Sequence, residues 1–156
     1  MDIEILLADI TDADEILALQ KLAYQSEAEL YQNWSIPPLT ETIEEIKSEF
    51  SSKTFLKTCR NGKLVGSVRV SFNRDTCFVG RLIVHPAYQK KGIGTKLMET
   101  IEKRFPSTER LELFTGLRSE GNIRLYEKLG YRIFRRKRLS AKVILVYMEK
   151  WGGILA

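Results

Sequence analysis

One stretch in the middle of the chain restricts its possible folds more than any other. It contains an apolar strand pattern at 77–84, an amphipathic helix pattern at 92–105 and a second strand pattern at 111–115. A strand, a helix and a strand in close succession form a crossover unit, whose two strands run parallel. Pro106 ends the helix, because proline cannot continue it. We therefore predict one parallel strand pair.

The segments on either side of this unit are typical of antiparallel strands. Asn61-Gly62 favours a type I′ hairpin turn, because both central residues of that turn need positive φ. The other predicted strands are 3–8, 54–60, 64–72, 131–136 and 141–150. Together these patterns predict an α+β, three-layer fold, with a mixed, mostly antiparallel central sheet of about seven strands and helices on both faces.

Apolar residues at helical spacing also recur outside the crossover unit. They begin near Ile16 and Ile43, and a last helix at 121–129 ends at Gly130. Residues 24–38 mix aromatic residues with acids and end in two prolines, so we expect a loop or a broken helix there. No repeat, low-complexity stretch or flexible linker interrupts the sequence, which favours a single domain over residues 1–156.

Composition excludes several classes of protein. With 44% hydrophobic and 29% charged residues, the chain is too apolar to be disordered, and no apolar run approaches the roughly 20 residues that span a bilayer. The start, Met1-Asp2-Ile3-Glu4, lacks the features of a secretory signal, so we expect a cytoplasmic location. Cys59 and Cys77 form no Cys-x-x-Cys pair, which predicts no metal site and two reduced thiols buried in strands.

The charge is divided unevenly along the chain. Residues 1–78 contain 8 basic and 13 acidic side chains, whereas residues 79–156 contain 17 and 7. This asymmetry suggests that an anionic ligand meets the second half. Nucleic acid is a disfavoured candidate, since no recognition motif is present and the basic run 135–138 is more typical of a solvated turn. We expect neither a nucleic-acid nor a membrane partner.

The loop Gln89-Lys90-Lys91-Gly92-Ile93-Gly94-Thr95 precedes the helix of the crossover unit. Free backbone N–H groups and the positive end of the helix dipole favour an anion there, and glycine permits close approach of a phosphate. The Walker pattern and the dinucleotide pattern Gly-x-Gly-x-x-Gly are both absent. By itself this loop is compatible with a turn that binds nothing.

Two motifs in order make the loop more specific. Gln89-x-x-Gly92-x-Gly94, after Leu82-Ile83-Val84-His85-Pro86, resembles the acyl-CoA-binding motif of the GNAT superfamily of N-acyltransferases. Asn122-x-x-x-Tyr126-x-x-x-Gly130-Tyr131 resembles its second signature. The resemblance covers about residues 3–148. It implies the acyl-CoA N-acyltransferase fold, with a splayed parallel pair, and acetyl-CoA as cosubstrate.

The resemblance also implies roles for individual residues. Pantetheine pairs with the backbone of Leu82, Ile83 and Val84, and the Ile83 amide stabilises the oxyanion. Pyrophosphate binds Gln89, Lys90, Lys91, Gly92, Ile93, Gly94 and Thr95. Asn122 bonds the pantetheine amide, and Tyr126 protonates the departing thiolate. Alternatives remain for several residues. Asn122 could cap its helix, and the Tyr126 ring could simply pack beneath the sheet. Lys90 and Lys91 could be ordinary solvated surface charges, and His85 a surface histidine at the end of its strand.

The general base and the acceptor are less determined. Many members of the superfamily carry a glutamate on the strand equivalent to 77–84, but this chain has Arg81 and no acid there. Glu27, Glu29, His85 and a water chain are candidate bases. The expected acceptor pocket, for a small-molecule or peptide amine, contains the aromatic and acidic residues Tyr24, Glu27, Glu29, Tyr31 and Trp34.

The favoured function is therefore an acetyl-CoA-dependent N-acetyltransferase that uses direct attack by a primary amine in a ternary complex. A noncatalytic acyl-CoA-binding sensor is the alternative. Dimers are frequent in the superfamily, but no patch in the sequence decides between a monomer and a homodimer.

Overall fold

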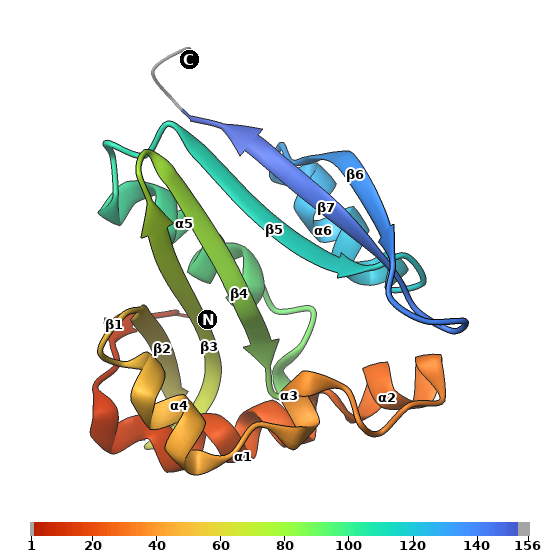
Figure 1. Ribbon diagram of the computed structural model, residues 1–156. Coiled ribbons are helices and arrows are strands. Elements are labelled where there is room, and N and C mark those ends of the chain that lie inside the picture. The colour runs from red at the N-terminus through yellow and green to blue at the C-terminus, as the bar shows by residue number, and fades with distance from the viewer. Residues whose placement is uncertain (1, 153–156) are drawn as a thin grey trace.

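The computed structural model describes residues 2–152, and these form a seven-stranded sheet in the order β1-β2-β3-β4-β5-β7-β6 (Figure 1). The β4–β5 pair is parallel, and the other neighbouring strands are antiparallel. The predicted mixed sheet is confirmed. Its strands are β1 (Leu6–Leu7), β2 (Thr54–Arg60), β3 (Lys63–Asn73), β4 (Thr76–Val84), β5 (Arg110–Gly116), β6 (Arg132–Arg138) and β7 (Ile144–Trp151).

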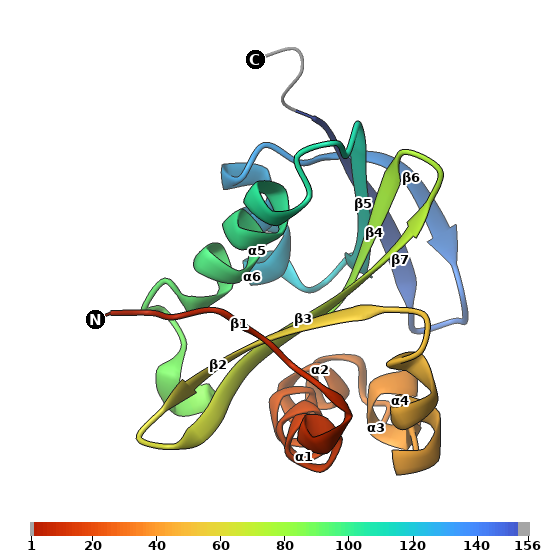
Figure 2. The same cartoon turned by 90° about the vertical axis from the view of Figure 1, so that its left-hand side faces the viewer.

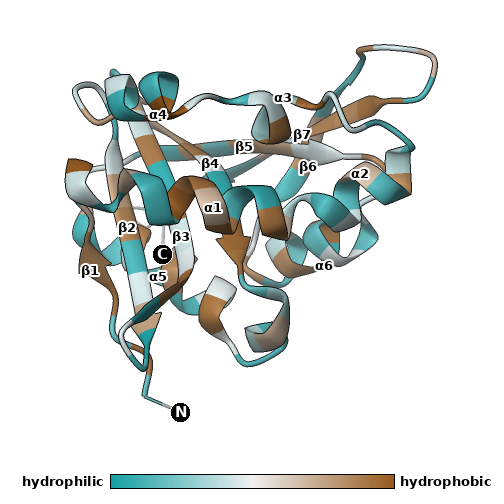
Figure 3. Cartoon of the chain, turned by 90° about the horizontal axis from the view of Figure 1, so that it is seen from below, coloured by the Kyte–Doolittle hydropathy of each residue, from teal (hydrophilic) through white to brown (hydrophobic). Residues whose placement is uncertain are grey.

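Helices cover both faces of the sheet (Figure 2). On one face lie α5 (Ile93–Arg104) and α6 (Glu120–Lys128). The other face carries α1 (Ala13–Ala23), α2 (Gln25–Tyr31), α3 (Pro37–Thr40) and α4 (Ile43–Glu49). Seen from below, α1 lies across the strands and α2 extends toward α6 (Figure 3). Two short 3-10 turns, η1 (Ile10–Asp12) and η2 (Pro86–Tyr88), complete the elements.

Local sequence signals account for several element ends. Asn61 and Gly62 have φ of 53° and 73°, as a type I′ turn requires. Gly130, just after α6, has φ of 99°, which ends the helix in the left-handed conformation. Thr42 and Glu45 cap α4 reciprocally, each side chain accepting a hydrogen bond from the backbone N–H of the other.

The parallel strands separate along their length. Their ladder covers three residue pairs, from Thr76–Arg110 to Phe78–Glu112. Beyond Phe78, β4 stays paired with β3 while β5 follows β7, so the two strands diverge like the arms of a V (Figure 1). The expected splayed pair is confirmed. The backbone of β4 on this side is left facing an opening.

A β-bulge bends β4 beside this opening. Arg69 pairs with Gly80 and Ser67 with Ile83, so Arg81 and Leu82 together lie opposite Val68. Arg81 has φ of 50°, in the left-handed region, which is uncommon for a residue other than glycine. The bulge changes the register of β4 where the strands part.

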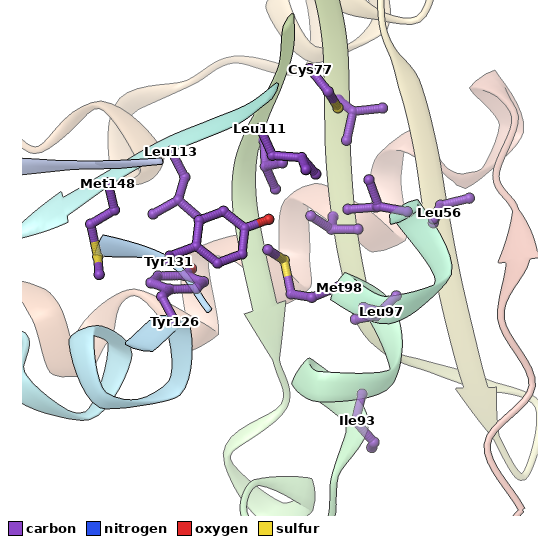
Figure 4. Packing of buried hydrophobic residues seen from close by; sticks show 14 of the residues in the cluster. Leu56, Cys77, Ile93, Leu97, Met98, Leu111, Leu113, Tyr126, Tyr131 and Met148 are labelled. Atoms are coloured by element: carbon purple, nitrogen blue, oxygen red, sulfur yellow. The ribbon is translucent and has the colours of Figure 1, made fainter. Parts of the chain in front are cut away.

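Two apolar cores hold the layers together. The larger one packs α5 and α6 on the sheet (Figure 4). In it, Leu97 and Met98 of α5 face Leu111 of β5, and Tyr131 lies beside Met148 of β7. The smaller one joins α1 and α4 to the other face through Ile16, Ile46 and Phe55, among others. Both faces of β3 are therefore covered, which explains why Ser67 and Arg69 on its polar side are buried as well.

The broken helix expected at 24–38 is present as α2 and the start of α3, separated by residues 32–36, and Gln32, just after α2, has φ of 48°. Two other local expectations change in the structure. The first strand is limited to Leu6–Leu7. Cys77 is buried, but the expectation of a buried Cys59 is wrong, since this side chain is exposed. The register of β2 shifts between Thr58 and Cys59, so the alternation of buried residues breaks there.

Candidate active site

The loop between β4 and α5 has the backbone conformation of an anion site. Lys90 and Gly92 have φ of 62° and 87°, and open space surrounds the position of a Cβ on Gly92. The Lys96 N–H donates to the Gly92 carbonyl at 3.0 Å and begins the helical ladder of α5. The preceding N–H groups of Ile93, Gly94 and Thr95 therefore remain available at the positive end of the helix. This arrangement fits a pyrophosphate.

The strand β4 presents alternate backbone groups to the opening. The His85 N–H donates to the Val65 carbonyl at 2.8 Å, so Val65–His85 is a hydrogen-bonded pair. Ser67–Ile83, two residues along, is then the next such pair, and Gly66–Val84 is a pair without hydrogen bonds. Val84 thus turns its backbone N–H and C=O away from β3 and toward the opening. Leu82, two residues earlier in the strand, does the same.

This pairing corrects the expectation for Ile83. Its amide belongs to the ladder with β3 and cannot serve as the oxyanion donor, and its side chain, 3% exposed, packs toward α1. The sequence motif placed the donor one residue too late, because the bulge at Arg81 and Leu82 sets which amides face the opening. The amide that faces the opening in this register is that of Leu82.

A groove of about 640 Å³ runs from this loop along β4 to α6. Most of the predicted cofactor residues border it, namely Leu82, Ile83, Val84, Gln89, Lys90, Gly92, Ile93, Gly94, Thr95 and Asn122. Lys91 is exposed and Tyr126 is buried behind the groove, and neither borders it. Arg124 and Lys128 of α6 add positive charge that the sequence reasoning did not assign.

A second cavity, of about 330 Å³, continues the groove through the gap between β4 and β5. Tyr24, Glu27, Leu82 and Asn122 border both spaces, so they mark the junction. The remaining wall is mostly apolar and includes α3, both splayed strands and residues near the β6–β7 loop. A ligand in the groove and another in the cavity would meet at this junction.

The two residues of the second motif lie on the same side of α6, as their spacing predicts. Asn122 is the third residue of α6 and its Nδ2 donates to Thr115 Oγ1 at 3.4 Å, so the capping alternative is excluded. Tyr126 borders the second cavity and is also packed in the larger core. Burial, with the nearby Tyr24 and Glu27, raises the pKa of the Tyr126 hydroxyl, which keeps it protonated.

A hydrogen-bond network fastens α2 to the end of β5. Ser119 Oγ donates to Glu27 Oε2 at 2.6 Å and lies 3.0 Å from the Tyr31 hydroxyl. The Arg118 N–H donates to the same hydroxyl at 2.9 Å. A Cβ on Gly116 would overlap the Tyr31 ring, so this close approach requires glycine. The network holds Glu27 at the junction.

The structure does not bring all predicted acceptor residues together. Tyr24, Glu27 and Tyr31 border the second cavity. Glu29 and Trp34, the latter 51% exposed, lie on the surface away from both spaces. Glu29 points outward because the inward side of α2 carries Glu27, Ala28 and Tyr31, and Trp34 lies in the turn that follows α2. His85 Nδ1 accepts the Ala87 N–H at 3.0 Å, and the ring borders neither space.

Sequence reasoning missed two parts of the cavity wall. Arg81 borders it from the bulge, and Leu139, Val143 and Leu145 border it from the far end of the sheet. The absence of an acid at 81 was visible in the sequence and drew attention to this position. The β6–β7 residues carried no signal, since they reach the cavity through the fold.

The model of the Acetyltransferase (GNAT) family matches residues 15–131. The match covers most of the chain and both motifs, and the sheet with its splayed pair agrees with it. This protein belongs to the GNAT acetyltransferase family.

Individual proteins similar to the chain include two from Bacillus subtilis (strain 168). UPF0157 protein YqkA is 29% identical over 158 residues, which cover 92% of this chain and 46% of that protein; the chain thus spans about half its length. S-alkylcysteine N-acetyltransferase is 24% identical over 140 residues, 82% of this chain and 78% of that protein. A PaiA N-acetyltransferase from Thermoplasma acidophilum, solved with coenzyme A, has the same fold, with a TM-score of 0.78 and 19% identity. The superposition covers 97% of this chain and 99% of that protein.

Residues 2–152 lack two kinds of feature. This part of the chain contains no cluster of three or more side chains suited to holding a metal ion. None of its helices combines the length and the apolar character needed to cross a membrane.

Proposed function

We propose that this protein is an N-acetyltransferase that moves the acetyl group of acetyl-CoA to the primary amine of an acceptor by direct attack. The observation that carries the proposal is the junction: the groove that fits coenzyme A and the second cavity share Tyr24, Glu27, Leu82 and Asn122. The B. subtilis relative named for S-alkylcysteine, which itself carries an amine, supports an N-acetyl acceptor.

Two junction residues, Leu82 and Glu27, and the cavity residue Tyr126 have chemical roles in this proposal. Acetyl-CoA supplies the acyl thioester, and the Leu82 N–H donates to the carbonyl oxygen as negative charge develops on it. Glu27 attracts the ammonium form of the acceptor and takes its proton, directly or through water. Tyr126 donates its hydroxyl proton to the thiolate that leaves. The walls of the gap hold amine and thioester together, which supplies much of the acceleration.

The first experiment measures binding and turnover together. Acetyl-CoA at about 100 times its Kd should raise the melting temperature by roughly 5–10 °C. Thiol release should then depend on an added amine, within a panel of amino acids, polyamines, aminoglycosides and peptide termini. Thermal stabilisation with no amine-dependent release would favour the acyl-CoA sensor, and no stabilisation would reject both functions.

Glu27→Gln should lower acceptor kcat/KM by about 10- to 100-fold and leave the Kd of acetyl-CoA unchanged, because the substitution removes a charge but keeps a hydrogen-bond acceptor for Ser119. Glu29→Gln is the matched control on the same helix, since Glu29 is exposed. Steady-state kinetics with a turned-over amine decide the matter. Equal effects of the two substitutions on acceptor kcat/KM would reject the proposed role of Glu27 in the reaction.

A further inference from the structure

A buried ionic cluster lies between α1, α4 and the strand β3. Arg69, 3% exposed, contacts both Glu41 and Glu49, and its Nη2 donates to Gln20 Oε1 at 2.7 Å. Lys53 Nζ lies 2.6 Å from Glu49 Oε1. Gln20 Nε2 donates in turn to Glu41 Oε1 at 2.8 Å. Each carboxylate of the cluster is therefore already bonded.

Arg81 joins this cluster at its edge, where the cluster meets the second cavity. Its Nε lies 4.0 Å from Glu41 Oε1, beyond hydrogen-bond distance. That Nε is buried and has no hydrogen-bond partner among the residues that the structure describes. With Arg81 included, the cluster holds three cations and two carboxylates. One positive charge is left over, on the residue that borders the cavity.

The leftover charge lies close to the reacting end of the cavity. Burial raises the pKa of the Tyr24 hydroxyl, and the charges of Arg81 and Glu27 act on it in opposite directions. Tyr24, Arg81 and Glu27 all border the same cavity, so one cation and one carboxylate line it. A small ligand bearing an ammonium and a carboxylate group would match this pair of charges.

The other residues that line the cavity determine which kind of side chain such a ligand can carry. Val79, Leu113, Phe114, Leu139, Val143 and Leu145 border the cavity. Its volume of about 330 Å³ is in the range of small-molecule sites. These side chains favour an apolar group, because burying it removes hydrocarbon surface from water.

We propose that the acceptor is a free α-amino acid with an apolar side chain, whose carboxylate binds the Arg81 guanidinium while its amine faces Glu27. The inference rests on the proposed acetyltransferase function and names its substrate class. A guanidinium binds a carboxylate through two parallel hydrogen bonds, and the Arg81 side chain, which is 24% exposed, borders the cavity. Arg81 is thus a specificity-determining residue, and a carboxylate would balance the charge of the cluster.

The test compares leucine with leucinamide and with glycine as acceptors of the wild-type protein. Leucinamide retains the shape of leucine without its carboxylate, and its amine has the lower pKa. More of it is therefore unprotonated, so any preference for leucine is underestimated. We expect kcat/KM for leucine to exceed that for leucinamide by about 10- to 100-fold. Glycine should be disfavoured by at least about tenfold, since it lacks the apolar group.

Arg81→Gln should remove the preference, lowering kcat/KM for leucine through KM while leaving leucinamide almost unchanged. Arg81→Lys should restore part of it, because the charge remains. Arg104→Gln, at the exposed far end of α5, is the control. Melting temperatures with and without acetyl-CoA check that each variant folds, and the wild-type comparison decides the proposal should Arg81→Gln fail to fold.

Three results would overturn the inference. Equal use of leucine and leucinamide by the wild type would reject the carboxylate contact while the acetyltransferase function stands. Equal losses for both acceptors in Arg81→Gln would make Arg81 a structural residue. Turnover of other amines but no amino acid would reject the substrate class. Absence of turnover with every amine is the separate result that rejects the proposed function itself.

Discussion

Tyr126→Phe should lower kcat by about 10²- to 10⁴-fold and leave the Kd of acetyl-CoA within twofold of the wild type. The hydroxyl borders the second cavity and burial raises its pKa, so it carries a proton throughout the pH range in which an amine attacks. Without that proton the thiolate must leave unprotonated. Single-turnover kinetics with a saturating amine, together with calorimetric titration of acetyl-CoA in the absence of amine, separate the two quantities.

The neighbouring Tyr131 provides a matched control. Its ring centroid lies 6.0 Å from that of Tyr126, it belongs to the same core, and it borders neither the groove nor the cavity. Its hydroxyl is buried without a hydrogen-bond partner among residues 2–152. Tyr131→Phe should therefore keep kcat and should not reduce stability, because it removes an unsatisfied polar group. A normal kcat in Tyr126→Phe would show that its ring serves packing alone.

Arg69→Met should lower the free energy of unfolding by about 3–5 kcal/mol, which is large for a single substitution. The guanidinium is 3% exposed, lies 4.7 Å from the Phe55 ring centroid and contacts Glu41 and Glu49. Removing it leaves two carboxylates close together without their shared cation. Urea unfolding at neutral pH measures the effect. Arg69→Met combined with Glu49→Gln should be less destabilised than the sum of the single changes.

The same cluster predicts a pH dependence of stability. Burial raises the pKa of Glu49, but hydrogen bonds, chiefly from Lys53, and the charge of Arg69 outweigh it and hold the pKa below its usual value. A carboxyl with a lowered folded-state pKa stabilises the fold above its unfolded pKa of about 4.3. This contribution is lost as the pH falls through the folded-state value. Acid unfolding of Glu49→Gln should show a smaller loss over that range, and an unchanged acid profile would contradict the assignment.

Much of the fold was open to sequence reasoning because its signals are local. Asn61-Gly62, Gly130 and Pro106 act within a few residues of the turns and helix ends they specify. The strand–helix–strand order around residues 92–105 requires a parallel pair by chain geometry alone. The loop from Gln89 to Thr95 was visible for the same reason, since its glycines and its place before a helix are adjacent in sequence.

What the sequence could not reveal depends on contacts between distant segments. The predicted Ile83 donor was wrong because a bulge of one residue in β4 sets which amides face the gap, and a bulge has no clear sequence signal. Glu27 and Glu29 look alike in sequence, yet helix geometry turns only Glu27 toward Ser119, 92 residues away.

By itself, the sequence determined the family, the layered sheet and the loop suited to pyrophosphate, since patterns of neighbouring residues carry that information. The tertiary structure decided the chemistry at the junction. It joined Glu27 of α2, Leu82 of β4 and Asn122 of α6 with Tyr24 from the turn between α1 and α2. It also left Arg81 unbalanced beside the cavity. The local net charge and the burial of a side chain depend on all the groups within a few ångströms of it, and most of these come from distant parts of the sequence. Both are therefore defined only once the chain has folded.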